Sequence, residues 1–122
     1  MISKLDLRPT LELPITETST PIELFQNQTL RPILKLQHEI YSSLFATYAS
    51  RQKSDYNLLT AAKKRTFIEL SLQKDMVLKN TFIGITIGMF TLAEVETYRL
   101  ESKEYNRRII TMLIERLKSE TK

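Results

Sequence analysis

The chain has 122 residues, which predicts a single domain, and its 42% hydrophobic and 26% charged content is typical of a globular protein. It contains no cysteine and one histidine, which excludes disulfide bonds, thiolate metal sites and a cysteine nucleophile. Its formal net charge of +4 fits a nucleic-acid partner, although mild basicity is more often a feature of a solvated helical surface.

The distribution of proline and glycine predicts the fold class. All four prolines fall within the first 32 residues, and Gly84 and Gly88 are the two glycines. Little material is left for the tight turns of a β-sandwich or barrel. We expect an all-α fold: a single compact bundle of about five or six helices over residues 20–122, preceded by an extended N-terminal arm over residues 1–19.

No segment of the chain indicates export or a membrane anchor. The first residues lack the continuous apolar run of a secretory signal. No apolar run approaches the roughly 20 residues of a membrane-spanning helix. We therefore expect a cytoplasmic protein without a membrane partner.

The arm carries an alternating apolar pattern. Pro9 and Pro14 disfavour a helix, and a period of two places alternate side chains on one side of an extended chain. Five large aliphatic residues in eleven are too many for a solvated tail, so we expect the arm to dock in a groove of its own domain or of a partner subunit. The residues predicted to dock are Leu5, Leu7, Leu11, Leu13 and Ile15.

The first helix is predicted over residues 21–28, with Thr20 as its cap, Pro21 in its first position and Glu23 completing a capping box. A second helix is predicted from about residue 30 to about residue 51, where Pro32 either opens it or kinks it. Its core stripe contains Leu30, Ile33, Leu34, Tyr41, Leu44, Phe45 and Tyr48.

Two polar residues of this second helix raise the question of a site. Gln37 lies in the middle of the apolar stripe, and we expect its amide to be buried and to bridge to a neighbouring helix. His38 lies on the flank of the stripe beside Glu39, but residues three and four away from it are not metal ligands. We interpret His38 as a boundary residue with one hydrogen bond, without a catalytic or metal role.

The next predicted helix begins at Thr60 and carries a basic first turn of Lys63, Lys64 and Arg65, which opposes the helix dipole. Either an acidic partner compensates for these charges or the helix begins a few residues later. A helix break is predicted near Lys74 and Asp75.

Residues 81–90, TFIGITIGMF, are apolar on every side and predict a buried central helix. Thr81, Gly84, Ile85 and Gly88 share one face, on which the two glycines lie four residues apart. This small-residue face predicts close contact with another helix, either within the chain or at a subunit interface.

Two more helices complete the predicted bundle. Thr91 and Glu94 form a capping box for a short helix through about Arg99. Ser102 is the predicted cap of the last helix, 103–119, in which Arg107 and Arg108 form a dibasic step. The core stripe of the last helix contains Tyr105, Ile109, Met112, Leu113 and Leu117.

No catalytic, cofactor-binding or metal-binding residue is predicted. The acidic residues are scattered, no spacing singles out a carboxylate pair, and no nucleotide-binding or nucleophile motif occurs. The groups most suited to contact nucleic acid are Lys63, Lys64, Arg65, Arg107 and Arg108, but they are few and interleaved with acids.

The segments FQNQTLRPILKLQ (25–37), IGMFT (87–91) and NRRII (106–110) resemble a family of small, uncharacterised bacterial proteins, some of which carry the label glyoxalase. The resemblance implies a helical domain of unknown role. Glyoxalases of the βαβββ type bind a divalent metal through histidine and glutamate, and those of the metallo-β-lactamase type need a histidine-rich motif. With one histidine and no predicted strand beyond the arm, the label does not fit, so no catalytic residue is carried over.

These observations lead to three functional hypotheses. The first is a non-enzymatic helical interaction protein, homodimeric through helix packing, in which the arm docks on its own domain or is exchanged between subunits. The second is a nucleic-acid-binding helical domain that uses the basic residues. An enzyme of any kind comes third.

Overall fold

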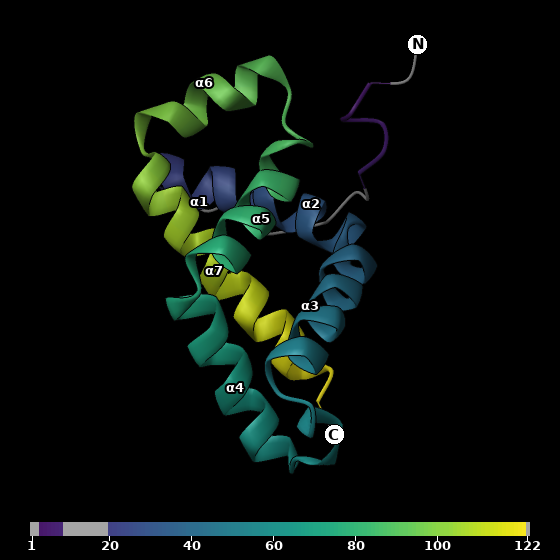
Figure 1. The fold of residues 1–122 in the computed structure, drawn as a ribbon. Coiled ribbons are helices and arrows are strands. Elements are labelled where there is room, and N and C mark those ends of the chain that lie inside the picture. Colours follow the sequence, from purple (N-terminus) through teal and green to yellow (C-terminus); the bar gives the residue numbers. More distant parts are fainter. Residues whose placement is uncertain (1–2, 9–19, 122) are drawn as a thin grey trace.

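Helices form every regular element in the parts of the chain that the computed structural model describes, residues 3–8 and 20–121. The fold is all-α, as the proline and glycine distribution predicts (Figure 1). The elements in chain order are α1 (Pro21–Phe25), the π-helical turn η1 (Gln26–Leu30), α2 (Arg31–Leu36), α3 (His38–Gln52), the 3₁₀ turn η2 (Tyr56–Leu58), α4 (Ala61–Lys74), α5 (Met76–Ile87), α6 (Leu92–Leu100) and α7 (Ser102–Ser119).

The first three elements form one continuous helical segment from Pro21 to Leu36, so the predicted end near residue 28 is wrong. Thr20 caps the segment, because its Oγ1 accepts a hydrogen bond from Glu23 N at 3.1 Å. Within η1, the N–H of Arg31 bonds to the carbonyl of Gln26, five residues earlier. A proline such as Pro32 cannot donate this kind of bond and crowds the preceding turn, and the wider π turn ahead of it allows the helix to continue.

The helix break comes at Gln37 rather than at Pro32. Gln37 has backbone angles of φ −95° and ψ 9°, and α3 begins at the next residue. The predicted single helix from residue 30 to residue 51 is therefore two helices, although its end was placed within one residue of the observed Gln52. The break also changes the direction of the apolar stripe, and Leu44, predicted as a core residue, is 41% exposed.

The ends of α4 and α5 follow the local capping signals. Thr60 Oγ1 accepts from Lys63 N at 3.2 Å, so α4 begins where it was predicted despite its basic first turn. Asp75 separates α4 from α5 and accepts from Val77 N and Leu78 N, both at 3.1 Å. Thr91 and Glu94 form the predicted capping box of α6. At α7, the predicted cap Ser102 is instead the first helical residue.

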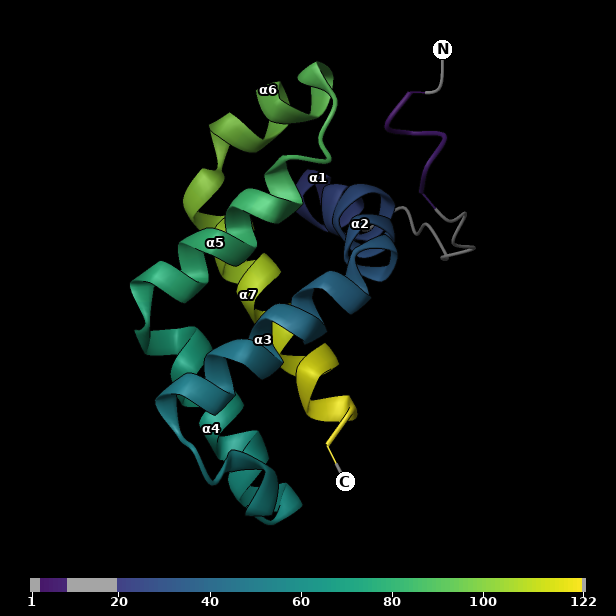
Figure 2. The ribbon, with the colours of Figure 1, turned by 45° about the vertical axis from the view of Figure 1, so that its right-hand side comes forward.

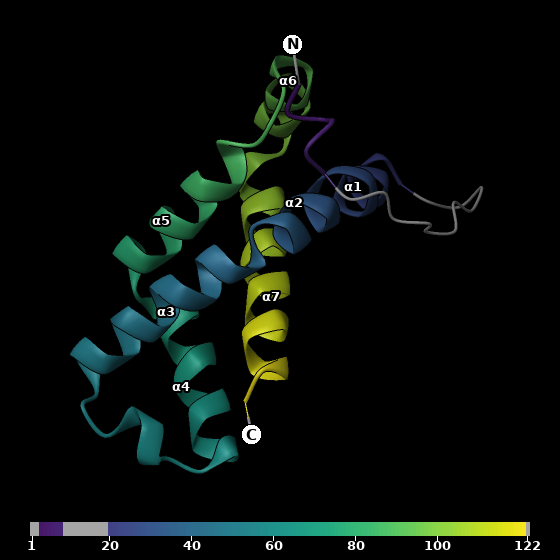
Figure 3. The ribbon, with the colours of Figure 1, turned by 90° about the vertical axis from the view of Figure 1, so that its right-hand side faces the viewer.

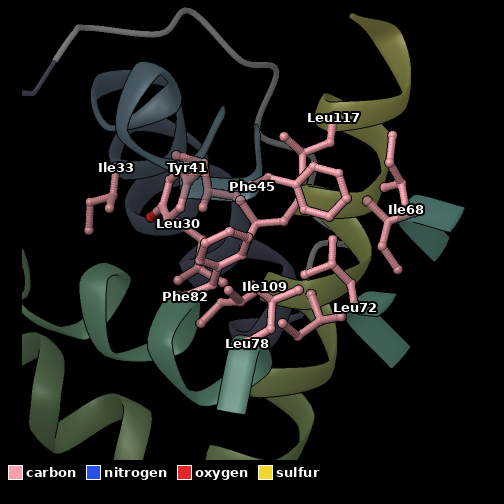
Figure 4. Close-up of a cluster of buried hydrophobic side chains, with 14 of the residues drawn as sticks. Leu30, Ile33, Tyr41, Phe45, Ile68, Leu72, Leu78, Phe82, Ile109 and Leu117 are labelled. Atoms are coloured by element: carbon pink, nitrogen blue, oxygen red, sulfur yellow. The ribbon is translucent and has the colours of Figure 1, made fainter. Parts of the chain in front are cut away.

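The last helix, α7, is the centre of the fold. It contacts α4, α5, α6 and η1, and Figure 3 shows α3, α4 and α5 on one side of it and α1 on the other. Tyr105, Ile109, Ile110, Leu113, Ile114 and Leu117 are its buried residues. Figure 4 shows Ile109 and Leu117 among core side chains that come from α3, α4 and α5.

The expectation that residues 81–90 form the buried central helix is wrong. The helix α5 buries one face only, through Leu78, Phe82 and Thr86. Its opposite face is exposed, and Met76 and Val77 at its start are 59% and 78% exposed.

Candidate functional site

His38 connects the beginning of α3 to the end of α7. Its Nε2 lies 2.9 Å from Glu120 Oε1, and its Nδ1 lies 3.3 Å from Arg116 Nη1. Both ring nitrogens therefore have partners from one helix end, whereas one hydrogen bond was predicted. Within residues 3–8 and 20–121, no group of three or more histidine, aspartate or glutamate side chains is placed to hold a metal ion.

The residues predicted for helix packing lie mainly on an exposed face of α5. We call Val77, Thr81, Gly84 and Gly88 the α5 face; all four are exposed, and Ile85 lies half-buried at its border. A Cβ built on Gly84 would have nothing within 4 Å among the described atoms, and one on Gly88 would meet only the carbonyls of Gly84 and Ile85, at 3.4 and 3.5 Å. The close contact predicted for this face is therefore not made within the described part of the chain.

The two glycines are not explained by backbone conformation. Gly88 has φ −58° and ψ −18°, and no described glycine has a positive φ. Glycine within a helix costs about 1 kcal/mol relative to alanine. The described part of the chain shows no contact at these glycines that offsets this cost.

The α5 face is also uncharged. From Asn80 to Phe90 the sequence contains no aspartate, glutamate, lysine or arginine. At the start of the helix Met76 is 59% exposed and Val77 is 78% exposed. A solvated helix surface normally carries charged residues, so this composition is typical of a surface that is covered.

Gln37, the other residue predicted for helix packing, is half-buried at the break between α2 and α3. Its backbone carbonyl accepts from Ile40 N and Tyr41 N at 3.0 and 3.1 Å and so begins α3. The predicted bridge from its amide to another helix is not observed among the described residues. Gln37 thus acts through its backbone, which the apolar pattern does not reveal.

The described part of the arm, residues 3–8, docks through its cations. Lys4 Nζ donates to the carbonyl of Phe90 at 3.0 Å, and Arg8 donates to the carbonyl of Met89 at 2.5 Å and to both carboxylate oxygens of Glu94 at 2.6 Å. Figure 2 shows this segment, in purple, beside the loop that joins α5 to α6. The contact is tight, because the side chains of Arg8 and Glu94 are only 5% and 15% exposed.

The aliphatic residues of the arm behave differently from the prediction. Leu5 and Leu7 are 55% and 52% exposed, and residues 3–8 form turns instead of an extended strand, with Asp6 N bonded to Ser3 O at 3.1 Å. The local turn bonds and the Arg8 anchor determine this conformation more strongly than the period-two pattern does. The other predicted docking residues, Leu11, Leu13 and Ile15, lie outside the described residues.

Glu94 holds this junction together. It completes the cap of α6 by accepting from Thr91 N at 2.9 Å, and it accepts from Thr29 Oγ1 at 3.2 Å. Burial raises the pKa of Glu94, but the hydrogen bonds and charge of Arg8 and the bonds from Thr91 and Thr29 outweigh it, so its pKa lies below the usual value. Sequence reasoning identified the cap but missed the pair with Arg8, 86 residues away.

The five predicted basic residues divide into two groups. On α4, Lys64 Nζ lies 5.6 Å from the centre of the Tyr56 ring, and Arg65 donates to Thr121 Oγ1 at 3.3 Å, just beyond the end of α7. Arg107 and Arg108 lie near the other end of α7, about 20 Å away at the usual helical rise. Lys63 is exposed in the first turn of α4, with no ion pair among the described residues.

Arg107 and Arg108 share one carboxylate. Arg107 donates to Glu104 at 2.5 and 3.0 Å, and Arg108 donates to it at 2.9 Å. The two guanidinium groups lower the pKa of Glu104 to about 2. Next to this cluster lies a cavity that also receives Arg31 and Arg116, which sequence reasoning missed. Arg116 lies two turns beyond Arg108 on the same helix, a spacing that could have indicated it, whereas Arg31 comes from α2 and has no such signal.

Comparisons with models of known protein families, with curated proteins and with solved structures find no match for this chain. The resemblance to the family that includes glyoxalase labels therefore stays a prediction. Across residues 3–8 and 20–121, no helix has both the length and the apolar character needed to cross a bilayer.

Proposed function

We propose that this protein is a non-enzymatic helical interaction domain that forms a homodimer through the α5 face. The observation that carries the proposal is the pair of glycines, Gly84 and Gly88, exposed four residues apart with open space above Gly84. Glycines at this spacing allow two helix backbones to approach closely, and their cost to helix stability is offset when a second helix packs there.

A second copy of the chain fits this surface because a two-fold axis places the same patch on both sides. The α5 face has no charge between Asn80 and Phe90, so two copies meet without like-charge repulsion. The helix is about 18 Å long, and a single helix pair buries less than the roughly 800 Å² per partner of a standard stable interface. We therefore expect a reversible dimer with moderate affinity.

The proposal is tested by sedimentation velocity over a concentration series that extends to roughly 50 µM. The wild type should change from monomer to dimer, and Gly84→Leu, which fills the open space, should remain monomeric. Ala93→Leu is the matched control, since Ala93 is exposed on α6, away from the α5 face. A wild type that stays monomeric throughout, or a Gly84→Leu variant that dimerises as well as the control, would contradict the proposal.

A smaller substitution separates folding from association. Gly84→Ala should stabilise the dilute monomer by about 0.5–1 kcal/mol, because alanine favours the helix and nothing obstructs its Cβ. The same change should weaken dimerisation, because it lifts the partner helix away from the backbone. If Gly84→Ala instead lowers the melting temperature of the dilute monomer, then a segment of the same chain covers the α5 face and the dimer proposal is wrong.

A further inference from the structure

A cavity of about 570 Å³ lies between the first helical segment and α7. Four arginines line it, Arg31, Arg107, Arg108 and Arg116, against one glutamate, Glu115. Leu34 and Met112 supply an apolar part of the wall. The volume lies within the usual range for pockets that bind small molecules.

Within residues 3–8 and 20–121, the carboxylates near this cavity do not balance its positive charge. Glu104 serves both Arg107 and Arg108, so one carboxylate faces two guanidinium groups. Among the described residues, Arg31 and Arg116 have no carboxylate within ion-pair distance. Burial and then the charge of Arg31 lower the pKa of Arg116, as expected for two cations held near each other.

Neutral groups hold these cations in position. Arg31 Nε donates to Asn27 Oδ1 at 2.8 Å, and Arg108 Nη1 donates to Gln26 Oε1 at 2.7 Å. Arg116 Nη1 approaches His38 Nδ1 at 3.3 Å. On its other side, the His38 ring places Nε2 at 2.9 Å from Glu120 Oε1. Arg31 and Arg116 are therefore oriented without a carboxylate partner among the described residues, whereas Arg108 shares Glu104 with Arg107.

The π turn η1 contributes to the same cavity. Gln26 and Arg31 are the two ends of its characteristic hydrogen bond, and both line the cavity. The extra residue of a π turn changes the register of a helix, and such turns are frequent at functional sites. Here Gln26 bonds to Arg108, and Arg31 lines the same cavity.

We propose that this cavity binds the phosphate group of a small organic phosphate, with Arg31, Arg108 and Arg116 as its ligands. Guanidinium groups bind phosphate through paired N–H donors. Because a phosphate group carries up to two negative charges and a carboxylate carries one, a site with several guanidinium groups favours phosphate. The organic part of the ligand lies against Leu34 and Met112. This inference is independent of the proposed dimer, because none of these residues belongs to the α5 face.

The test is isothermal titration calorimetry of the full chain with phenyl phosphate, inorganic phosphate and phenol at low ionic strength. Phenyl phosphate should bind with a Kd of about 1 mM or lower, more tightly than inorganic phosphate, and phenol should not bind. Absence of phenyl phosphate binding at ten times that concentration would overturn the proposal.

Variants assign the binding to the cavity. Arg31→Gln and Arg116→Gln should each weaken phenyl phosphate binding at least tenfold, whereas Arg51→Gln, an exposed arginine on α3, should leave it unchanged. Arg31 is exposed, so its substitution should preserve the fold even if that of Arg116 does not. Equal binding by Arg31→Gln and the wild type would overturn the assignment.

Titration with a single-stranded DNA oligonucleotide distinguishes a site for nucleic-acid phosphates from a site for a small organic phosphate. If the oligonucleotide binds, loses affinity in Arg31→Gln, and phenyl phosphate does not bind, the site contacts nucleic acid and the small-ligand proposal is overturned. Gly84→Leu should bind phenyl phosphate as the wild type does, so failure of the dimer and failure of the phosphate site are distinguishable.

Discussion

Tyr41 and Thr86 place two hydroxyl groups inside the apolar core, and the geometry determines which one donates. The two oxygens lie 2.7 Å apart, and Thr86 Oγ1 also lies 2.9 Å from the carbonyl of Phe82, which can only accept. The single hydroxyl proton of Thr86 is thus used within its own helix, so Tyr41 donates to Thr86. Burial raises the pKa of Tyr41 to about 12, despite the opposing charge of Arg116.

This direction predicts an asymmetry between two nearly isosteric substitutions. Thr86→Val leaves the Tyr41 hydroxyl buried without an acceptor and should cost about 2–3 kcal/mol of unfolding free energy. Tyr41→Phe removes the donor and leaves Thr86 bonded to Phe82, so it should cost only about 1 kcal/mol. Urea denaturation followed by circular dichroism measures both. The double variant should lose about as much unfolding free energy as Tyr41→Phe alone, and less than the sum of the two single losses. A loss equal to that sum would show that the two hydroxyl groups do not interact.

At the scale of elements, Arg8 and Glu94 attach the N-terminal segment to α6. The pair joins parts of the chain 86 residues apart, and Glu94 also caps α6 and bonds to Thr29 of η1. A single carboxylate thus connects three elements. The arm is attached by charge and hydrogen bonds, and Leu5 and Leu7 remain half exposed.

Removing the cation should therefore destabilise more than the arm. Arg8→Ala leaves Glu94 poorly solvated with one fewer partner, and we expect a loss of about 2 kcal/mol in unfolding free energy. Hydrogen exchange should show faster opening in α6, because its cap depends on the same carboxylate. Leu7→Ala is the control and should change stability by less than about 0.5 kcal/mol. Equal effects of the two substitutions would mean that the arm is held by its aliphatic residues.

The same pair predicts acid sensitivity. The pKa of Glu94 is lower in the folded chain than in the unfolded chain, so its contribution to stability is present above the unfolded value, about 4.3, and is lost as the pH falls through the folded value. The difference in unfolding free energy between the wild type and Glu94→Gln should thus be largest near neutral pH and shrink below pH 4.3. Denaturation midpoints measured over this range test it. Glu96→Gln, at an exposed position of the same helix, should show little difference at any pH.

At the scale of the whole molecule, local signals predicted the elements and long-range contacts determined the rest. Each helix start with a side-chain cap uses a residue that accepts a hydrogen bond from a backbone N–H two or three residues ahead. These starts, and the break between α4 and α5, could therefore be predicted from sequence; the capping residues are Thr20, Thr60, Asp75 and Thr91. The break at Gln37 carries no such signal, because no side chain caps the start of α3.

The candidate surfaces were harder to predict for the same physical reason. Glycine spacing located the α5 face, but whether Gly84 meets its own chain or solvent depends on how α4 and α7 cover α5. Arg107 and Arg108 could be found as a dibasic pair, but Arg31 joins them across 76 residues. A periodic pattern identifies the faces of one helix, and it carries no information on which faces of different helices meet.

The central position of α7 predicts that the molecule unfolds as one unit. Leu113 is fully buried on α7, the helix that α4, α5 and α6 all contact. Leu113→Ala should cost about 3–4 kcal/mol, from lost apolar burial and a cavity that its neighbours cannot fill. Leu100→Ala, at a 79% exposed position of α6, should change stability by less than about 0.5 kcal/mol. In Leu113→Ala the amides of α4 and α5 should lose hydrogen-exchange protection by the same free energy, because both helices lose the surface that they share. Protection lost in α4 alone would show that the bundle consists of separately stable parts.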